Sequence, residues 1–513
     1  MCVTPCQDTG VRRKVKLGVA QMITPVVSIQ RRIYMDIVKN RNQINIVEKL
    51  DFGRLDAELD TSILNYFVQT GSVEEIKKGK YLVLGRKGSG KTAIFKYLEN
   101  NEHTKDNVVP LGLKEYPYAA HKTLKENGMS DDSAHTLSWT FLIILISIKF
   151  LETENKLSRK EKKVLNDALK VIGKYSSINL VIKWINKVKK WDLKILGSGA
   201  GMEISDSMDD SLSTQMHDFI EKGKDILNNY YNSSGKPVTV LIDGIDDSWD
   251  GKEPTKNFII GSLRAVRNLY SDLDRGRNMA PAVMFLRTDI WDSINFNDKN
   301  KYMQDAVKLK WTDDNLVSVV EARAQYSFNK ENGTESNIAW ADIFEVGTPI
   351  RNRRDSRGYV LSRTMGRPRD ILSFSRLALH RAQELNHSII KNSDITDVES
   401  EYSEHIYNEL ENEYNLDGNW FKNFENVVQK IKKRSFSMED WVRNSEELDS
   451  EFDHKKVFDI LFEISVIGVI QKGGSSGGSK HEYRYSNPKL EHGDKTVFTF
   501  HPAIVKYLRL RDR

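Results

Sequence analysis

The chain has 513 residues, which is too long for a single hydrophobic core and predicts about two to four domains. Apolar residues make up 39% of the chain and charged residues 29%, which is typical of a globular protein and excludes the fibrous and disordered classes. The formal net charge of +5 is small for this length, so composition alone requires neither nucleic acid nor a membrane as a partner.

Residues 1–45 are predicted to form an N-terminal extension. Basic residues at 12–16 precede an apolar stretch at 17–27, but polar residues and a proline interrupt that stretch. We therefore expect an arm, or a start codon placed too far upstream, rather than a secretory signal. The two cysteines of the chain, Cys2 and Cys6, exclude a disulfide framework and a zinc cluster and fit a reducing cytoplasm.

The next region, residues 46–325, begins with a predicted helix–strand–helix succession. Apolar residues recur with helical spacing from 54 to 69, which predicts a helix. Residues 81–84 form a short apolar run, which predicts a buried strand of a parallel sheet. Apolar residues at 93–98 predict that a second helix follows the strand closely.

The loop between this strand and helix is predicted to bind phosphate. It fits the pattern G-x-x-x-x-G-K-[ST], and its expected ligand contacts come from Gly85, Arg86, Lys87, Gly88, Ser89, Gly90, Lys91, Thr92 and Ala93. The glycines let the backbone approach the phosphates, so that successive N–H groups and the positive helix end face one anion. We expect Lys91 to reach the β- and γ-phosphates of ATP, and the Thr92 hydroxyl to ligate Mg²⁺.

An apolar helix and a helical insertion are predicted after the second strand, which we place at residues 108–113. The apolar run at 137–151 is shorter than the roughly 20 residues that a bilayer requires, so we interpret it as a core helix and expect no membrane partner. Residues 152–236 are predicted to be an insertion with two basic helices, one at 158–174 and one that contains two tryptophans. A glycine cluster at 197–201 is predicted to be a turn rather than a second nucleotide site.

Acidic residues follow the next predicted strand. The β-branched run at 238–243 ends in Asp243, and a carboxylate at the carboxyl end of a parallel strand lies where such sheets bind ligands. Asp243 is therefore predicted to bind the same Mg²⁺ as Thr92, directly or through a water molecule. Asp246 and Asp247 come next, and one of them is predicted to orient the attacking water.

A basic residue comes directly after the fourth predicted strand, which we place at residues 282–286. Arg287 follows this strand, and at the edge of the same sheet its cation could contact the γ-phosphate; the alternative is a surface pair with Asp289 or Asp292. A fifth strand is predicted at 307–309. Five strands separated by helices predict a doubly wound α/β core with a parallel sheet.

Residues 326–400 are predicted to form a helical lid. Five arginines between residues 351 and 363 form an arginine-rich turn, and Pro368 and Arg369 follow it at the start of an amphipathic helix. The lid would cover the nucleotide. The arginine-rich turn is equally compatible with DNA phosphates.

Residues 401–513 are predicted to form a winged-helix domain. Three predicted helices precede two strands that flank a glycine- and serine-rich loop at 473–480. The third helix, at 455–467, would present Asp459 and Glu463 to DNA beside two lysines. A winged helix that faces protein is therefore at least as well supported as one that reads DNA.

Four motifs together resemble a known group of ATPases. They are the loop GRKGSGKT, the strand and turn VTVLIDGIDD, the segment FLRTD and the segment GRPRDIL, and the predicted winged helix follows them. This combination resembles the STAND and origin-recognition-like branch of AAA+ ATPases. Its spacing is most similar to the bacterial FunZ-type P-loop ATPases, several of which occur in anti-phage defence loci.

The resemblance implies a role for each matching residue. It makes Lys91 and Thr92 the ligands of phosphate and Mg²⁺, and Asp243 the Walker B acid. It places the water-orienting acid at Asp247, where this chain has Asp instead of the Glu of the family, which implies slow turnover. It also makes Arg287 the arginine that ends the sensor strand, and it aligns Pro368 and Arg369 with the lid motif and the sensor arginine of the group.

The favoured hypothesis is a cytoplasmic ATPase, slow or acting mainly as an ATP-binding switch. Its nucleotide state would control assembly with a protein partner or a separate effector subunit, in anti-phage defence if the resemblance extends to function, and a homo-oligomer is a further option. The alternative is a DNA-binding ATPase similar to origin-recognition proteins, in which winged helix and arginine-rich turn hold the duplex. A small-molecule kinase is disfavoured because no substrate lid follows the phosphate loop.

Overall fold

The computed structural model describes residues 45–511 except for internal segments at 102–103, 114–130, 173–209, 274–277, 334, 352–353, 415–419, 447–452, 472–478 and 494. Several predictions fall outside the described residues. These are the N-terminal extension apart from its last residue, the second basic helix with Trp184 and Trp191, the glycine cluster at 197–201, Arg353 and most of the loop at 473–480.

A five-stranded parallel sheet forms the centre of the first half of the molecule. Its strands are β1 (Leu82–Gly85), β2 (Val108–Gly112), β3 (Thr239–Asp243), β4 (Ala282–Arg287) and β5 (Ala306–Lys308). They are ordered β2-β3-β4-β1-β5 and all pairs are parallel. The five strands and the doubly wound α/β class are therefore confirmed. The sheet also places β4 beside β1, so that Arg287 lies opposite Gly85 in the register.

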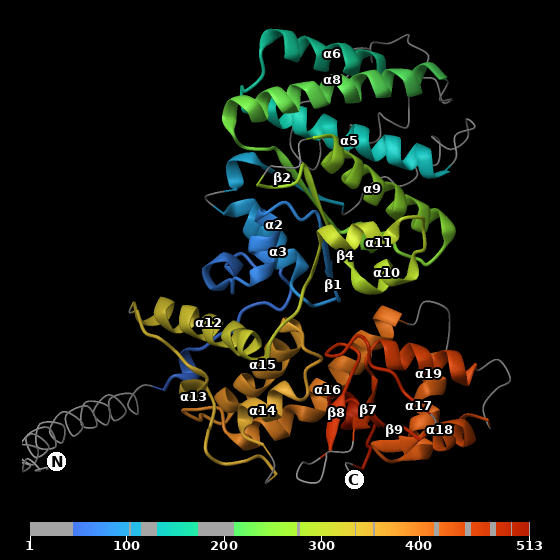
Figure 1. Ribbon diagram of the computed structural model, residues 1–513. Helices are drawn as coiled ribbons and strands as arrows, with labels where there is room; N and C mark the ends of the chain where they lie inside the picture. Colours follow the sequence, from blue (N-terminus) through green and yellow to red (C-terminus); the bar gives the residue numbers. More distant parts are fainter. Residues whose placement is uncertain are drawn as a thin grey trace, which may run out of the picture.

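Helices cover the sheet and extend beyond it at one end (Figure 1). They are α2 (Gly71–Lys77), α3 (Lys91–Asn100), α5 (Asp131–Thr153), α6 (Arg159–Ile172), α8 (Asp210–Ser234), α9 (Glu253–Asp272), α10 (Thr288–Ser293) and α11 (Lys299–Tyr302). Short 3-10 helices lie at η3 (Lys105–Asn107), η4 (Ile245–Ser248) and η5 (Met303–Asp305). In Figure 1, α6 and α8 stack outside α5, farthest from the C-terminal half of the chain.

Helix α5 is the apolar helix predicted at 137–151, and it extends beyond that range at both ends. By length and composition Ser133–Thr153 could cross a membrane, yet 83% of its apolar window is buried in the fold. Two glycines let neighbouring helices approach it closely. A Cβ atom at Gly261 of α9 would lie 2.4 Å from the Cβ of His135, and one at Gly223 of α8 would lie 2.2 Å from Ile144. The prediction of a core helix is confirmed.

The predicted helix at 54–69 is wrong, because this segment contains only the 3-10 helix η2 (Ile63–Tyr66). Three aspartates accept a hydrogen bond from the backbone N–H two residues later, at Asp51, Asp56 and Asp60. Such local bonds compete with helical hydrogen bonding and favour turns. The buried guanidinium of Arg323 then holds the segment, since it donates to the carbonyls of Phe52 and Arg54.

A second hydrophobic core lies in the C-terminal half and also contains the residues next to the 3-10 helix η1 (Val47–Lys49). Its first helices are α12 (Asp313–Asn332), α13 (Trp340–Ile343), α14 (Ser356–Leu361), α15 (Pro368–Glu384) and α16 (Asn392–Tyr414). Aromatic stacking links them, for example between Phe374 of α15 and Tyr402 of α16, whose ring centroids are 4.3 Å apart. Helix α12 runs across the predicted domain boundary at 325 and packs in this second core.

The last described elements combine four helices with a small antiparallel sheet. They are α17 (Trp420–Ile431), β6 (Ser435–Ser437), α18 (Met438–Ser445), α19 (His454–Glu463), β7 (Ile467–Gln471), β8 (Lys480–Glu482), β9 (Val497–Phe500) and α20 (Pro502–Val505). The sheet order is β6-β9-β7-β8. The predicted helices and the β7–β8 hairpin are present, whereas β6 and β9 were not predicted. Helix α19 ends earlier than expected, because Ser465 adopts a left-handed conformation with φ of 68°.

Candidate nucleotide-binding site

The phosphate-loop motif lies between β1 and α3, as predicted. Two of its glycines adopt φ angles that other residues avoid, +76° at Gly88 and +93° at Gly90. Gly90 is the N-cap of α3, and no side chain caps that end. No side chain therefore accepts a hydrogen bond from the first N–H groups of α3. Helix N-termini with free N–H groups of this kind bind anions.

Lys91 is the first residue of α3, and its side chain turns back over the loop. Its Nζ donates a hydrogen bond to the Gly85 carbonyl at 3.2 Å, and the residue is 9% exposed. Burial of an ammonium group is costly unless anions or dipoles surround it. A phosphate group bound at the loop would supply the anion.

The two predicted Mg²⁺ ligands lie in contact. Thr92 Oγ1 donates a hydrogen bond to Asp243 Oδ2 at 3.0 Å, which connects the first turn of α3 with the end of β3. Burial, followed by the charge of Asp246, raises the pKa of Asp243 to about 6, while Lys91 and Thr92 act in the opposite direction. A cation bound at this carboxylate would favour its ionised form.

A hydroxyl and a carboxylate oxygen are ligand types that suit Mg²⁺. Among the described residues, no group of three or more His, Cys, Asp or Glu side chains could hold a metal by itself. The residues present therefore fit a Mg²⁺ ion that takes its remaining ligands from water and from nucleotide phosphates, as is usual for this ion.

The two acids after Asp243 line the same cavity but differ in their surroundings. Gly244, with φ of 80°, turns the chain into η4, which carries both Asp246 and Asp247. Asp246 Oδ2 lies 4.0 Å from Nε of Arg287, whereas Asp247 is exposed. Each could contact a water molecule near the phosphates, so the choice between them stays a prediction.

Arg287 ends β4 and donates hydrogen bonds to two carboxylates, besides its longer ion pair with Asp246. Its Nε and Nη2 donate to Asp289 at 3.1 and 2.6 Å, and Nη2 also donates to Glu413 Oε1 of α16 at 3.3 Å. The alternative pairing with Asp289 is therefore present, together with a contact that the sequence did not indicate. Arg287 also lines the cavity, and its role as γ-phosphate sensor stays a prediction.

The start of α15 contacts the phosphate loop directly. The backbone N–H of Arg369 donates to the Gly88 carbonyl at 3.4 Å, and Arg367 Nη1 donates to the Lys87 carbonyl at 3.4 Å. From the loop, Arg86 donates to the carbonyl of Met365. Residues from both cores thus enclose a cavity of about 450 Å³, which is lined by Lys91, Thr92, Asp243, Asp246, Asp247, Arg287, Pro368 and Arg369 among others.

Three residues at this site were missed by the sequence analysis. Trp311 Nε1 donates to the Ser89 carbonyl at 2.9 Å, and the buried Arg367 pairs with Asp370 at 2.9 Å. Glu413 has a side chain that is 1% exposed and contacts Arg287. Arg367 belongs to the GRPRDIL motif and could have been noted there, whereas nothing local distinguishes Glu413 from the other acids of its helix.

Comparison with known proteins gives one family match. A model described as the FunZ-associated C-terminal helical domain matches residues 314–411, which correspond to α12 to α16. This supports the FunZ-type part of the resemblance for that region. A relative, the putative transposon gamma-delta 80.3 kDa protein of Escherichia coli strain K12, is 23% identical over 493 residues; the alignment covers 90% of this chain and 67% of the relative.

Similar solved structures are more distant. The Aeropyrum pernix ORC2 protein in ADPNP and ADP complexes has a TM-score of 0.39 and 10% identity, and the match covers 88% of this chain and 97% of that one. The Aeropyrum pernix ORC1 protein in complex with DNA has a TM-score of 0.36 and 9% identity, with 87% and 95% covered.

Proposed function

We propose that this chain binds Mg-ATP in the cavity between its two cores and acts as a nucleotide-dependent switch or slow ATPase. The observation that carries the proposal is the contact between Thr92 Oγ1 and Asp243 Oδ2 beside the Lys91 ammonium. A hydroxyl and a carboxylate that suit Mg²⁺, and a lysine that suits phosphate, thus lie together at the N-terminus of α3. A glycine loop without a ligand would not require a buried lysine and an aspartate with a raised pKa side by side.

In this proposal each residue has a defined task. The loop amides and Lys91 bind the β- and γ-phosphates, and Thr92 and Asp243 hold Mg²⁺. The bound Mg²⁺ would neutralise phosphate charge during hydrolysis. Asp247, or else Asp246, would orient the attacking water.

The proposed switch follows from the position of the cavity. Arg287 belongs to the sheet, whereas Glu413, Pro368 and Arg369 belong to the second core, and all of them line the same space. A γ-phosphate would compete with Glu413 for Arg287 and contact Arg369, so the two cores would be held differently in the ATP-bound and ADP-bound forms. A protein partner, an effector subunit or a second copy of the chain would bind one of these forms.

A role in cytoplasmic anti-phage defence is a hypothesis that rests on the FunZ-type resemblance. It is tested by plaque counts in a host that expresses the chain from its natural locus. If the hypothesis holds, Lys91→Ala abolishes protection; protection that persists in this variant contradicts a nucleotide-dependent defence role.

The nucleotide proposal is tested by isothermal titration of ATP in the presence of Mg²⁺. Lys91→Ala should remove measurable binding, because the cation nearest the phosphates is lost. Lys78→Ala is the matched control, since this exposed lysine lies outside the cavity lining. Unchanged affinity of the Lys91→Ala variant would exclude the assigned site.

The DNA-binding alternative has less support. Asp459 and Glu463 of α19 line a cavity of about 750 Å³ together with Asp289 and Asp292 of α10, so this face of the helix points toward the sheet-containing half. A duplex could reach this face only if the two halves moved apart, and the acids would then lie in its major groove. If the arginine-rich turn and the winged helix neutralised about five DNA phosphates, a plot of log affinity against log salt concentration would have a slope of about −4 to −5. We expect weak or no duplex binding; a low-salt dissociation constant tighter than roughly 10⁻⁷ M would reverse this ranking.

A further inference from the structure

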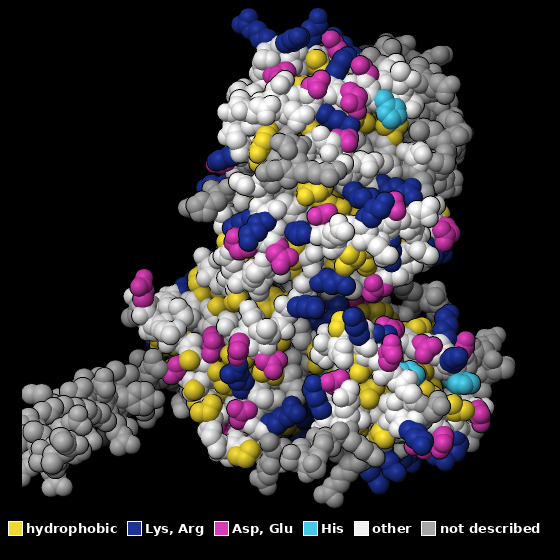
Figure 2. All heavy atoms as spheres, in the orientation of Figure 1, with side chains coloured by type: hydrophobic (Ala, Val, Ile, Leu, Met, Phe, Trp, Pro, Cys, Tyr) yellow, Lys and Arg dark blue, Asp and Glu magenta, His cyan; other side chains and the backbone are white. Residues whose placement is uncertain are grey.

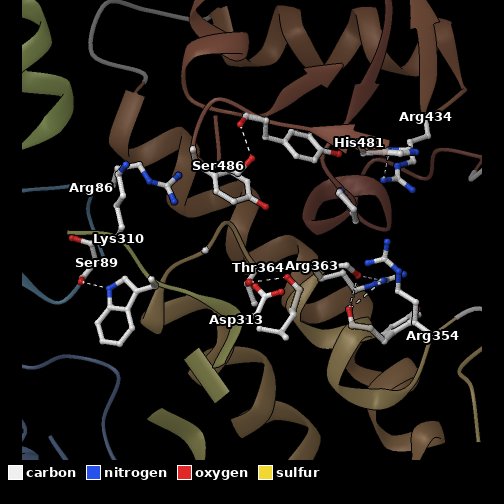
Figure 3. A pocket seen from close by; sticks show the side chains of 18 of the residues that line it. Arg86, Ser89, Lys310, Asp313, Arg354, Arg363, Thr364, Arg434, His481 and Ser486 are labelled. Carbon is white, nitrogen blue, oxygen red and sulfur yellow. Dashed lines mark hydrogen bonds between the residues drawn. The ribbon is translucent and has the colours of Figure 1, made fainter. Parts of the chain in front are cut away.

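A second cavity, of about 620 Å³, lies on the other side of the phosphate loop. Its walls come from the loop, the segment after β5, the arginine-rich turn with α14, and the β8 region. In Figure 3, Arg86, Ser89 and Lys310 lie on one side of it, while Arg354, Arg363, Arg434 and His481 lie on the other. Figure 2 shows Lys and Arg side chains gathered where the sheet-containing half meets the helices below it.

The lining of this cavity is strongly basic. It contains one carboxylate, Asp313, and the six cations Arg86, Lys310, Arg351, Arg354, Arg363 and Arg434. Glu399 contributes a second acid from behind the wall and pairs with Arg351 and Arg363. Within the described part of the chain, Arg86, Lys310 and Arg354 have no carboxylate partner among the ion pairs, so a positive charge remains in the cavity.

The buried groups around the cavity respond to this charge. The fully buried His501 has a pKa well below its ordinary value, first because of burial and then because of the charges of Arg434, Arg86, Arg367 and Arg363. Burial also lowers the pKa of Arg86, and the neighbouring charge of Arg367 adds to that shift. An anion in the cavity would offset the repulsion among these arginines.

Polar and aromatic groups complete the site. Ser89 is 4% exposed, and its Oγ has no hydrogen-bond partner among the described residues. A buried hydroxyl without a partner is uncommon in proteins. Trp311, Tyr359 and Tyr485 present rings to the same space, and the guanidinium of Arg86 lies 5.1 Å from the Tyr485 ring centroid.

The size of the cavity limits which anionic ligands can fit in it. A volume of about 620 Å³ lies within the range of small-molecule sites, roughly 300–1,000 Å³. A DNA duplex is far wider than such a cavity. A single phosphate is too small to contact the cations on both sides of the cavity at once. The geometry points to a second ligand site for a small molecule with several phosphate groups, separate from the ATP site. Arg86 and Ser89 of the phosphate loop, which we expected at the ATP, line this second cavity instead.

Binding should be measured in the full-length chain with the first site disabled. In a Lys91→Ala background, isothermal titration with inositol hexakisphosphate and with inorganic pyrophosphate, at about 150 mM salt to screen non-specific attraction, should give saturable one-to-one binding of at least the first probe. Adding Lys310→Ala and Arg354→Ala should weaken this binding by about tenfold or more, because two charge-assisted contacts are lost.

The matched control in the same background is Lys160→Ala with Lys163→Ala. These exposed lysines of α6 carry the same total charge and do not line the cavity, so we expect less than about a twofold change. Equal weakening in both double variants would mean diffuse surface attraction and would overturn the proposal. So would a lack of saturable binding, or tight binding of single-stranded DNA that the hexakisphosphate does not displace. None of these readouts depends on ATP binding by the first site.

Discussion

Nη2 of Arg287 lies 3.3 Å from Oε1 of Glu413, and this ion pair joins the end of β4 to the last turn of α16. The side chains are 13% and 1% exposed, so water screens the pair only weakly. Burial raises the pKa of Glu413, while Arg287 and Arg367 lower it. The contact therefore links the two cores at the edge of the proposed ATP site.

Arg287→Ala should distinguish ATP from ADP. If Arg287 contacts only the γ-phosphate, the variant loses about 1–3 kcal/mol of ATP binding, as expected for a charge-assisted hydrogen bond, and keeps its ADP affinity. Titration of both nucleotides in the presence of Mg²⁺ checks this. Equal losses for both nucleotides, or no loss for either, would mean that Arg287 serves only its pairs with Asp289 and Glu413.

Glu413→Gln is a second test of the role of Arg287. The amide keeps the shape of the side chain but removes the charge that competes with phosphate for Arg287, so ATP affinity should rise while ADP affinity stays the same. A thermal melt must first show that the variant folds, because Arg367 also loses a partner at 3.8 Å. A fall in ATP affinity in the folded variant would contradict this competition.

Asp247→Asn should stop hydrolysis without preventing ATP binding. An amide cannot accept the proton of the attacking water, and loss of a general base lowers rates by about 10²–10⁴. Phosphate release under single-turnover conditions gives the rate, and Asp246→Asn is the comparison. If Asp247→Asn hydrolyses ATP at the parental rate and Asp246→Asn does not, the water-orienting acid is Asp246, whose Oδ2 lies 4.0 Å from Nε of Arg287.

Gly88→Ala should weaken Mg-ATP binding by about tenfold, equivalent to about 1.4 kcal/mol. The backbone has φ of +76° there, and the added Cβ would lie 3.1 Å from the Cβ of Arg369. Both effects disturb the contact between phosphate loop and α15. Gly112→Ala is the control, because a Cβ at that position meets nothing within 4 Å. Titration of the two variants should separate them, and equal affinities would contradict the strain argument.

Arg323→Met should destabilise the nucleotide-free chain by about 3–5 kcal/mol. Arg323 pairs with the buried Asp60 at 3.2 Å, and removal of one partner leaves an uncompensated buried charge. Urea unfolding followed by circular dichroism measures the change. Lys330→Met on the exposed side of the same helix should stay within about 0.5 kcal/mol of the parent. A similar small change for Arg323→Met would show that Asp60 finds another partner.

Some parts of the fold and the site could be predicted because their signals are local. A short run of β-branched apolar residues favours a buried strand. Glycines that can adopt left-handed φ angles allow the tight backbone of the phosphate loop. The five strands, the core helix α5 and the proximity of Thr92 and Asp243, the predicted Mg²⁺ ligands, follow from such patterns. The helix predicted at 54–69 failed because aspartate turns overrode its periodicity.

The sequence by itself determined the phosphate loop, the parallel sheet and the acids at its carboxyl edge, since each depends on residues within one turn or one strand. Only the tertiary structure decided that Glu413 meets Arg287 across 126 positions, that Trp311 contacts the loop, and that basic residues of four segments surround one cavity. The physical reason is that the packing of the two cores sets these distances. The periodicity of a sequence shows which face of a helix or strand is buried, but not which charged residues of distant segments meet when the chain packs.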